Sequence, residues 1–155
     1  MASPKLARYE RIRLQVAELI ESVADPTARR ATLVALLHHK LSGLSWTGFY
    51  MLRGGELVVD VYQGPLACLV LAAHQGVCWA GIDRRASVIV PDVHAFEGHI
   101  PCDSRTQSEI VVPLLGSDGA VVGVLDLDSL RPAHFDDEDR QGLEPLVALI
   151  AATAP

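Results

Sequence analysis

The sequence predicts an α+β domain, in which a central antiparallel sheet of about six strands is flanked by N-terminal and C-terminal helices. Apolar residues recur at helical spacing near both ends of the chain, and short strand-like runs fill the middle. Glycine-containing turn signals join several of these runs, and hairpins imply antiparallel pairing. With 155 residues, half of them hydrophobic, the chain is expected to form one domain around one core.

Residues 4–43 predict two helices. In LARYERIRLQVAELIESVA, apolar residues follow the helical period from Leu6 onward. The second helix starts with Asp25 as its N-cap and Pro26 at the first helical position, and it is expected to end at Gly43. The arginines of this segment are interpreted as solvent-facing: Arg11, Arg13, Arg29 and Arg30.

Residues 44–130 are expected to hold the sheet and a functional loop. A short apolar run lies at 66–73, a short helix is expected at 76–86, and the predicted strands cover 45–53, 56–62, 87–92, 108–116 and 120–129. The glycine pair at 54–55 and the SDG sequence at 117–119 predict hairpin turns. The polar loop over 92–107 is long for a compact domain, and such loops tend to be functional.

A last helix is expected over residues 135–153. Its first turn is acidic, as the helix dipole favours, and Pro145 is expected to kink or interrupt it.

Composition and charge exclude several classes of function. A net charge of -6 disfavours nucleic-acid binding, which needs a basic face. The longest uncharged run, residues 61–82, contains Gly64, Pro65 and His74 and therefore does not predict a membrane helix. The charged N-terminus lacks the apolar stretch of a signal peptide. We therefore expect a cytoplasmic protein, in which three cysteines do not form a permanent disulfide framework.

The three cysteines lie in different surroundings. Cys102 lies in the polar stretch GHIPCDSRTQSEI, where Arg105 or a protonated His99 could stabilise a thiolate. Cys68 and Cys78 lie in apolar stretches typical of core cysteines. On local sequence alone, Cys102 is either an unreactive loop residue or a reactive thiol with a chemical role.

The sequence also contains candidates for zinc binding and for other cysteine chemistry, since Cys102 with His99 could form the pair of a cysteine hydrolase. His94, His99, Cys102 and Cys78 could supply four zinc ligands, but their spacing lacks the tight pairs of zinc sites, so no metal is expected. The sequence has no G-x-S-x-G motif and no phosphate-binding glycine loop, so neither an α/β-hydrolase nor a nucleotide site is indicated.

Acidic and aromatic side chains form a second group. Asp126 and Asp128 alternate along one predicted strand and share a face, and the hairpin brings Glu109 near the same end. These acids form either a solvated sheet edge or a pocket wall that holds a cation or moves protons. Trp46 and Tyr50 also share a face, and core packing and a binding wall both fit them.

Four segments carry a resemblance to a known family. The stretches WTGFY, GVCWAG, VPDVHAFEGHIPCDSRTQSEIVVPL and GVLDLDS, with FDDED after the last, resemble the free methionine-(R)-sulfoxide reductases built on a GAF domain. The resemblance runs from about Leu14 into the C-terminal helix and implies a single GAF domain over residues 1–155.

The resemblance implies a reaction against oxidative damage that needs no cofactor. Cys102 would attack the sulfur of free L-methionine (R)-sulfoxide, and the resulting sulfenic acid would condense with Cys68 of GPLAC. Thioredoxin would then reduce the disulfide. Cys78 would be an alternative resolving cysteine, although this chain has Trp79 where the family has glycine.

The resemblance also implies roles for the second group. Trp46 and Tyr50 would surround the S-methyl group, and Glu109, Asp126 and Asp128 would form the polar wall, with one carboxyl group protonated near neutral pH. The alternative is a GAF sensor of a small ligand or of redox state, which would not need three placed cysteines. The oligomeric state is left open, with a homodimer as one candidate.

Overall fold

A computed structural model describes residues 1–152 and contains a six-stranded antiparallel sheet, which confirms the predicted α+β fold. Across the sheet the strands run in the order β3-β2-β1-β6-β5-β4. Their bounds are β1 Trp46–Arg53, β2 Glu56–Gln63, β3 Val70–Leu71, β4 Val88–Val90, β5 Ser108–Leu115 and β6 Val121–Ser129.

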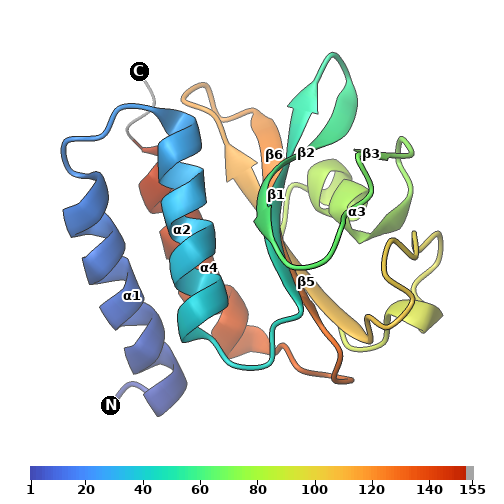
Figure 1. The fold of residues 1–155 in the computed structure, drawn as a ribbon, viewed down its shortest axis with the longest axis horizontal. Coiled ribbons are helices and arrows are strands. Elements are labelled where there is room, and N and C mark those ends of the chain that lie inside the picture. The colour runs from blue at the N-terminus through green and yellow to red at the C-terminus, as the bar shows by residue number, and fades with distance from the viewer. Residues whose placement is uncertain (153–155) are drawn as a thin grey trace.

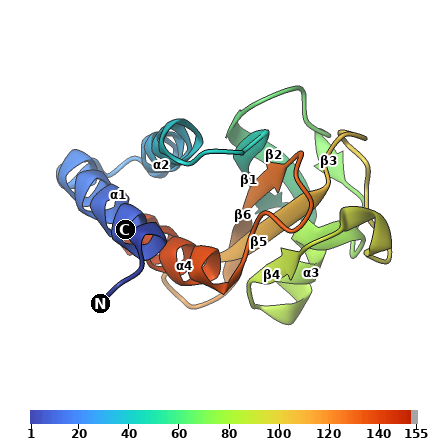
Figure 2. The same ribbon diagram turned by 90° about the horizontal axis from the view of Figure 1, so that it is seen from below.

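Three helices cover one face of the sheet, as Figures 1 and 2 show. They are α1 (Pro4–Ile20), α2 (Pro26–Lys40) and α4 (Asp137–Ala151). Their buried apolar residues form one core cluster with Phe49 and with the residues of β5 and β6 that face them, which are Ile110, Val112, Leu114, Leu125 and Leu127. The opposite face carries α3 (Gly76–Arg84) and the loop after β4, which begins with a 3-10 turn at Val93–Ala95. Within residues 1–152, no helix is both long and apolar enough to span a bilayer.

The ends of the helices follow the signals in the sequence. The Asp25 side chain accepts the N–H of Ala28 at 2.7 Å, so the predicted N-cap is confirmed. Helix α2 ends at Lys40 instead of Gly43, because Leu41 already takes an extended conformation, and Gly43 takes a left-handed one (φ 81°) in the turn that follows. At α4, Asp136 and Asp139 form a reciprocal capping box.

The interpretation of Arg29 and Arg30 as solvent-facing is wrong. Arg29 is buried and donates hydrogen bonds to the carbonyl oxygen of Ile20, in the last turn of α1, and to that of Val23, in the loop that follows. The side chain of Arg30 is only 11% exposed and pairs with Asp60 at 2.7 Å, which ties α2 to β2.

Pro145 does not interrupt α4, which runs from Asp137 to Ala151, so the predicted interruption is wrong. Proline removes the hydrogen bond that the carbonyl of Gln141 would accept, but both residues lie on the exposed side of the helix, where water can replace it. Packing of Leu143, Leu146 and other residues of the buried face holds the helix together. The predicted end at residue 153 lies outside the described residues.

Sheet register places the predicted site residues together. Strand β6 lies between β1 and β5, with Asp128 opposite both Trp46 and Glu109. Asp126 is opposite Gly48 of β1, two residues further along the same face. The acids and the aromatic residue therefore meet at one end of three adjacent strands, on the face that carries α3.

Candidate active site

A disulfide joins Cys68, in the loop before β3, to Cys102, in the long loop before β5. Their Cα atoms are 5.5 Å apart, although 34 residues separate them in the sequence. Cys102 is exposed and Cys68 is half-buried, whereas Cys78 is a buried free thiol in the first turn of α3. The fold thus brings all three cysteines to the same region, and Cys68 is not the core residue that its apolar neighbours indicated.

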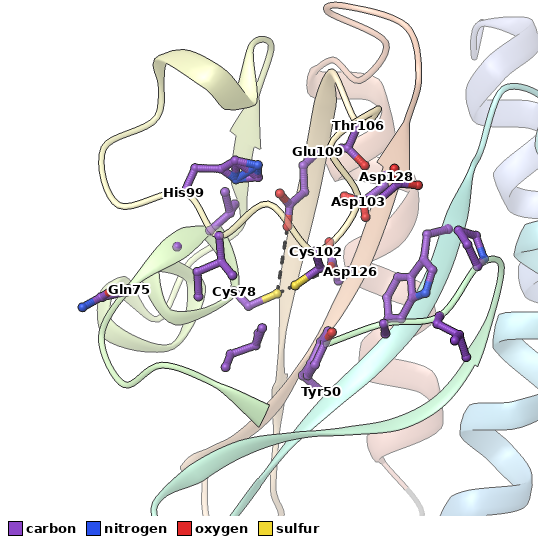
Figure 3. A pocket seen from close by; sticks show the side chains of 18 residues that line it. Tyr50, Gln75, Cys78, His99, Cys102, Asp103, Thr106, Glu109, Asp126 and Asp128 are labelled. Carbon is purple, nitrogen blue, oxygen red and sulfur yellow. Dashed lines mark hydrogen bonds between the residues drawn. The ribbon is translucent and has the colours of Figure 1, made fainter. Parts of the chain in front are cut away.

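A cavity lies between β1, β5, β6, α3 and the two cysteine loops (Figure 3). Every catalytic and substrate-binding residue that the family resemblance implies lines it except Cys68, which reaches it through the bond to Cys102. The lining residues are Trp46, Tyr50, Pro65, Leu66, Ala67, Leu71, Gln75, Gly76, Val77, Cys78, His99, Ile100, Cys102, Asp103, Thr106, Glu109, Asp126 and Asp128.

Stacked aromatic rings form one side of the cavity, and one of them is hydrogen-bonded to the loop that carries Cys68. The Trp46 and Tyr50 rings stack with their centroids 5.7 Å apart, and the Tyr62 ring also stacks with Trp46, at 5.2 Å. The Tyr50 hydroxyl donates a hydrogen bond to the carbonyl oxygen of Cys68 at 3.0 Å. Tyr50 therefore positions the backbone of Cys68 as well as shaping the cavity.

Burial dominates the electrostatics of the acids. It raises the pKa of Glu109 and of Asp128 well above the ordinary carboxyl range, and the charge of Asp126 adds to this effect. Burial also raises the pKa of Asp126, to about 6. The cluster therefore carries at least one proton near neutral pH, because its carboxylates cannot all ionise in so little water.

Cys78 lies inside this acid cluster as a protonated thiol. Burial and the neighbouring carboxylates raise its pKa, and its S–H donates toward Asp126 Oδ2 at 3.4 Å and Glu109 Oε1 at 4.0 Å. In Figure 3 the Glu109 carboxyl group points down toward the sulfur atoms of Cys78 and Cys102. A thiol held in this way is a hydrogen-bond donor and a poor nucleophile.

The same three residues have the geometry of a partial metal site. One ligand atom each from Cys78, Glu109 and Asp126 lies within 4.8 Å of the others. A metal would need these groups deprotonated, whereas burial favours their protonated forms. The zinc set weighed from the sequence is not assembled, because Cys102 is bonded to Cys68 and His94 does not line the cavity.

Two polar atoms of the cavity lining lack hydrogen-bond partners within the described chain. They are Oδ1 of Asp126 and Nε1 of Trp46, one an acceptor and the other a donor, and both are buried. Buried polar atoms are rarely left unpaired, so each of the two is available to a water molecule or to a polar group of a ligand.

The cations expected to activate Cys102 are not available for that role. Arg105 is held by Asp103, with Nε and Nη2 at 3.0 and 2.9 Å from the two carboxylate oxygens. Burial and the nearby His94 lower the pKa of His99, so this imidazole is neutral at pH 7. The suggestion that Arg105 or protonated His99 stabilises a thiolate is therefore not supported.

Sequence reasoning missed several residues of the cavity. Asp103 and Thr106 come from the polar loop, and their only signal was the length of that loop. Gln75 and Gly76 come from the start of α3, where no side chain caps the free N–H groups of the first turn. These N–H groups border the cavity and favour an anion, such as a carboxylate.

Trp79 does not disturb the cavity. Its indole is buried outside the lining, packs against the His74 ring in a tilted arrangement with centroids 4.6 Å apart, and donates to the carbonyl oxygen of Leu71 at 3.3 Å. The bulky side chain thus fixes α3 against β3 and leaves Cys78 facing the acids.

Comparison with known proteins identifies the family of the chain. A sequence model of the GAF domain matches residues 27–153. The free methionine-R-sulfoxide reductase of Escherichia coli is 43% identical over 81% of this chain and 78% of its own length. The enzyme of the same name from Saccharomyces cerevisiae is 41% identical over 69% of this chain, which spans 61% of that relative.

A solved structure extends the likeness to three dimensions. The free methionine-R-sulfoxide reductase of Neisseria meningitidis, in complex with its substrate, superposes with a TM-score of 0.92 at 38% identity, covering 99% of this chain and 92% of that one. The chain therefore belongs to the GAF-domain family of free methionine-R-sulfoxide reductases.

Proposed function

We propose that this chain reduces free L-methionine (R)-sulfoxide to L-methionine in the cytoplasm, and that thioredoxin recycles the enzyme. The observation that carries the proposal is the Cys68–Cys102 disulfide at the mouth of a cavity with buried acids and stacked aromatic rings. The name and substrate complex of the similar structure support the substrate class.

The proposed chemistry begins at the sulfoxide. A carboxyl group protonates the sulfoxide oxygen while the Cys102 thiolate attacks the sulfur, and the products are methionine and a sulfenic acid on Cys102. The thiol of Cys68 then displaces water from the sulfenic acid and forms the disulfide. Two electrons pass from the two thiols to the sulfoxide.

Glu109 is the proposed proton donor. The pKa of its carboxyl group is raised by burial and by the neighbouring acids, so it holds a proton at neutral pH. Asp126 has the lower pKa, about 6, and an oxygen without a partner. We assign Asp126, with Asp128, to the ammonium group of the amino acid.

The remaining walls fit the rest of a free amino acid. The open N–H groups at the start of α3 suit its carboxylate, and the stacked rings of Trp46 and Tyr50 suit its S-methyl group. A methionine sulfoxide within a protein has amides in place of both charges, so the site favours the free amino acid.

Cys78 is assigned a supporting role in this scheme. Its thiol is buried and protonated and donates a hydrogen bond to Asp126, so we assign it to holding the acid cluster in place. The role of a second resolving cysteine is secondary, because a buried, protonated thiol is a poor nucleophile. No step requires a metal or a cofactor, because thiols supply the electrons and a carboxylic acid supplies the proton.

A coupled assay tests the proposal. With thioredoxin, its reductase and NADPH present, free methionine (R)-sulfoxide should cause NADPH consumption, and the (S) isomer should not. The N-acetylated (R) substrate should show about ten- to a hundredfold lower kcat/KM, since it loses a charge-assisted hydrogen bond. Equal efficiency on the free and N-acetylated substrates would remove the ammonium assignment.

A further inference from the structure

The disulfide lies beside an exposed apolar surface. Apart from Met1, the most exposed large hydrophobic side chains within residues 1–152 are Leu66 at 87% and Leu69 at 73%, and Val70 follows closely in sequence at 48%. We call these three residues the Cys68 rim, because they flank Cys68 on both sides. Clusters of exposed apolar side chains are uncommon and typically mark an interaction site.

Charge is absent from the segment that carries the rim. Residues 61–82 contain no Asp, Glu, Lys or Arg. On the other side of the disulfide, Asp103 and Arg105 neutralise each other in an exposed ion pair. A partner that approaches Cys68 therefore meets a surface with apolar contacts and little charge to desolvate.

The backbone beside the rim is also open to a partner. Strand β3 is the edge of the sheet and pairs only with β2, through Val70 with Val58 and Leu71 with Leu57 (Figure 1). An unpaired strand edge offers N–H and C=O groups to an extended segment of another protein. This edge begins two residues after Cys68.

We propose that the Cys68 rim is the docking surface for a protein dithiol reductant of the thioredoxin type. The proposal rests on the redox cycle proposed above, because the disulfide at the centre of the surface identifies the partner. Redox partners meet through small, transient interfaces, for which a few exposed aliphatic side chains suffice. Turnover by a small-molecule dithiol does not need this surface.

The docked partner would reduce the disulfide in two steps of thiol–disulfide exchange. A partner thiolate attacks one sulfur of the Cys68–Cys102 disulfide, and the other sulfur leaves as a thiolate and takes a proton. The second thiol of the partner then attacks the mixed disulfide, so the partner becomes a disulfide and both enzyme thiols are restored. Two electrons and two protons pass to the enzyme.

The test compares two reductants on the double variant Leu69→Ser/Val70→Thr. Neither residue lines the cavity, so methionine released in a single turnover and turnover with dithiothreitol should stay within twofold of wild type. The kcat/KM for thioredoxin should fall at least tenfold. The matched control is Leu14→Ser/Leu19→Ser, which removes exposed leucines from α1 and should leave both reductants unaffected.

Each outcome decides between the two proposals. An unchanged kcat/KM for thioredoxin in the rim variant would overturn the docking surface and leave the reductase reaction intact. Loss of turnover with both reductants in the rim variant would show a structural effect; the single change Leu69→Ser, at a largely exposed side chain, then repeats the comparison. Failure of wild type to release methionine would instead refute the proposed function.

Discussion

Glu109, Asp126 and Asp128 are held where burial raises the pKa of each carboxyl group. The protonated form that this favours is the one that sulfoxide chemistry needs, since the sulfoxide oxygen must gain a proton. Burying ionised carboxyl groups also costs folding free energy, so the same property that serves the reaction weakens the fold at high pH.

The pH profile of the chemical step tests the role of Glu109. As pH rises through its raised pKa, Glu109 loses the proton, so the single-turnover rate should fall at alkaline pH after rising with ionisation of Cys102. Glu109→Gln should lower the maximal rate by about 10²–10⁴ and remove the alkaline decline. Retention of the same alkaline decline in Glu109→Gln would assign the proton to Asp126 or Asp128.

Asp126→Asn should stabilise the fold at high pH. A folded pKa near 6, above the ordinary value of 3.8, means that the stability from protonated Asp126 is complete below about pH 4 and is lost as pH rises through 6. Asparagine avoids this loss, so guanidinium unfolding should show a gain of up to about 3 kcal/mol at pH 8 and little gain at pH 4.

The control for this comparison is Glu18→Gln, at an exposed position of α1, which should change stability little at either pH. Equal destabilisation by Asp126→Asn at both pH values would show that packing of the carboxylate, and not its ionisation, matters.

The helices on the far face are tied together by close contacts that the sequence did not reveal. Gly142 of α4 is buried, and a Cβ atom there would lie 2.2 Å from the ring of Tyr9 in α1. The Tyr9 hydroxyl in turn donates to Asp139 at 2.7 Å. Glycine at this position permits the close approach of the two helices.

Gly142→Ala should therefore destabilise the protein, although alanine favours helices. The gain in helix propensity is about 1 kcal/mol, whereas overpacking against a rigid ring costs about 1–3 kcal/mol, and a contact of 2.2 Å belongs to the upper end. Ala148→Gly at an exposed site of α4 measures propensity alone. A higher melting temperature for Gly142→Ala would show that α1 moves away at little cost.

The sequence predicts helix caps and turns that depend on neighbouring residues, but it does not predict the tertiary contacts that these elements make. The cap at Asp25 and the hairpin at Gly54 and Gly55 depend on nearby residues, so the sequence identifies them. Arg29 was placed in solvent because helical spacing is the same for a solvated arginine and for one that caps a neighbouring helix. Strand β3 is shorter than its apolar run, since only Val70 and Leu71 pair with β2.

In the whole molecule, one face of the sheet carries most of the hydrophobic core and the other face carries the candidate active site. The face under α1, α2 and α4 holds the larger aliphatic core, and the opposite face carries buried acids, thiols and unpaired polar atoms. Strand periodicity predicts that Asp126 and Asp128 share a face. Strand periodicity does not predict that Cys102 lies next to Cys68, because the two residues lie in different loops, 34 residues apart in the sequence. Only the family resemblance implied that these two cysteines pair.

The central claim is that Cys102 attacks the sulfoxide and Cys68 resolves the product. The most direct measurement is the methionine released by stoichiometric amounts of fully reduced enzyme without a recycling system. Cys68→Ser should release about one methionine per molecule, because attack precedes resolution, and Cys102→Ser should release none. Release of about one methionine per molecule by Cys102→Ser would contradict the account and assign the attack to another thiol.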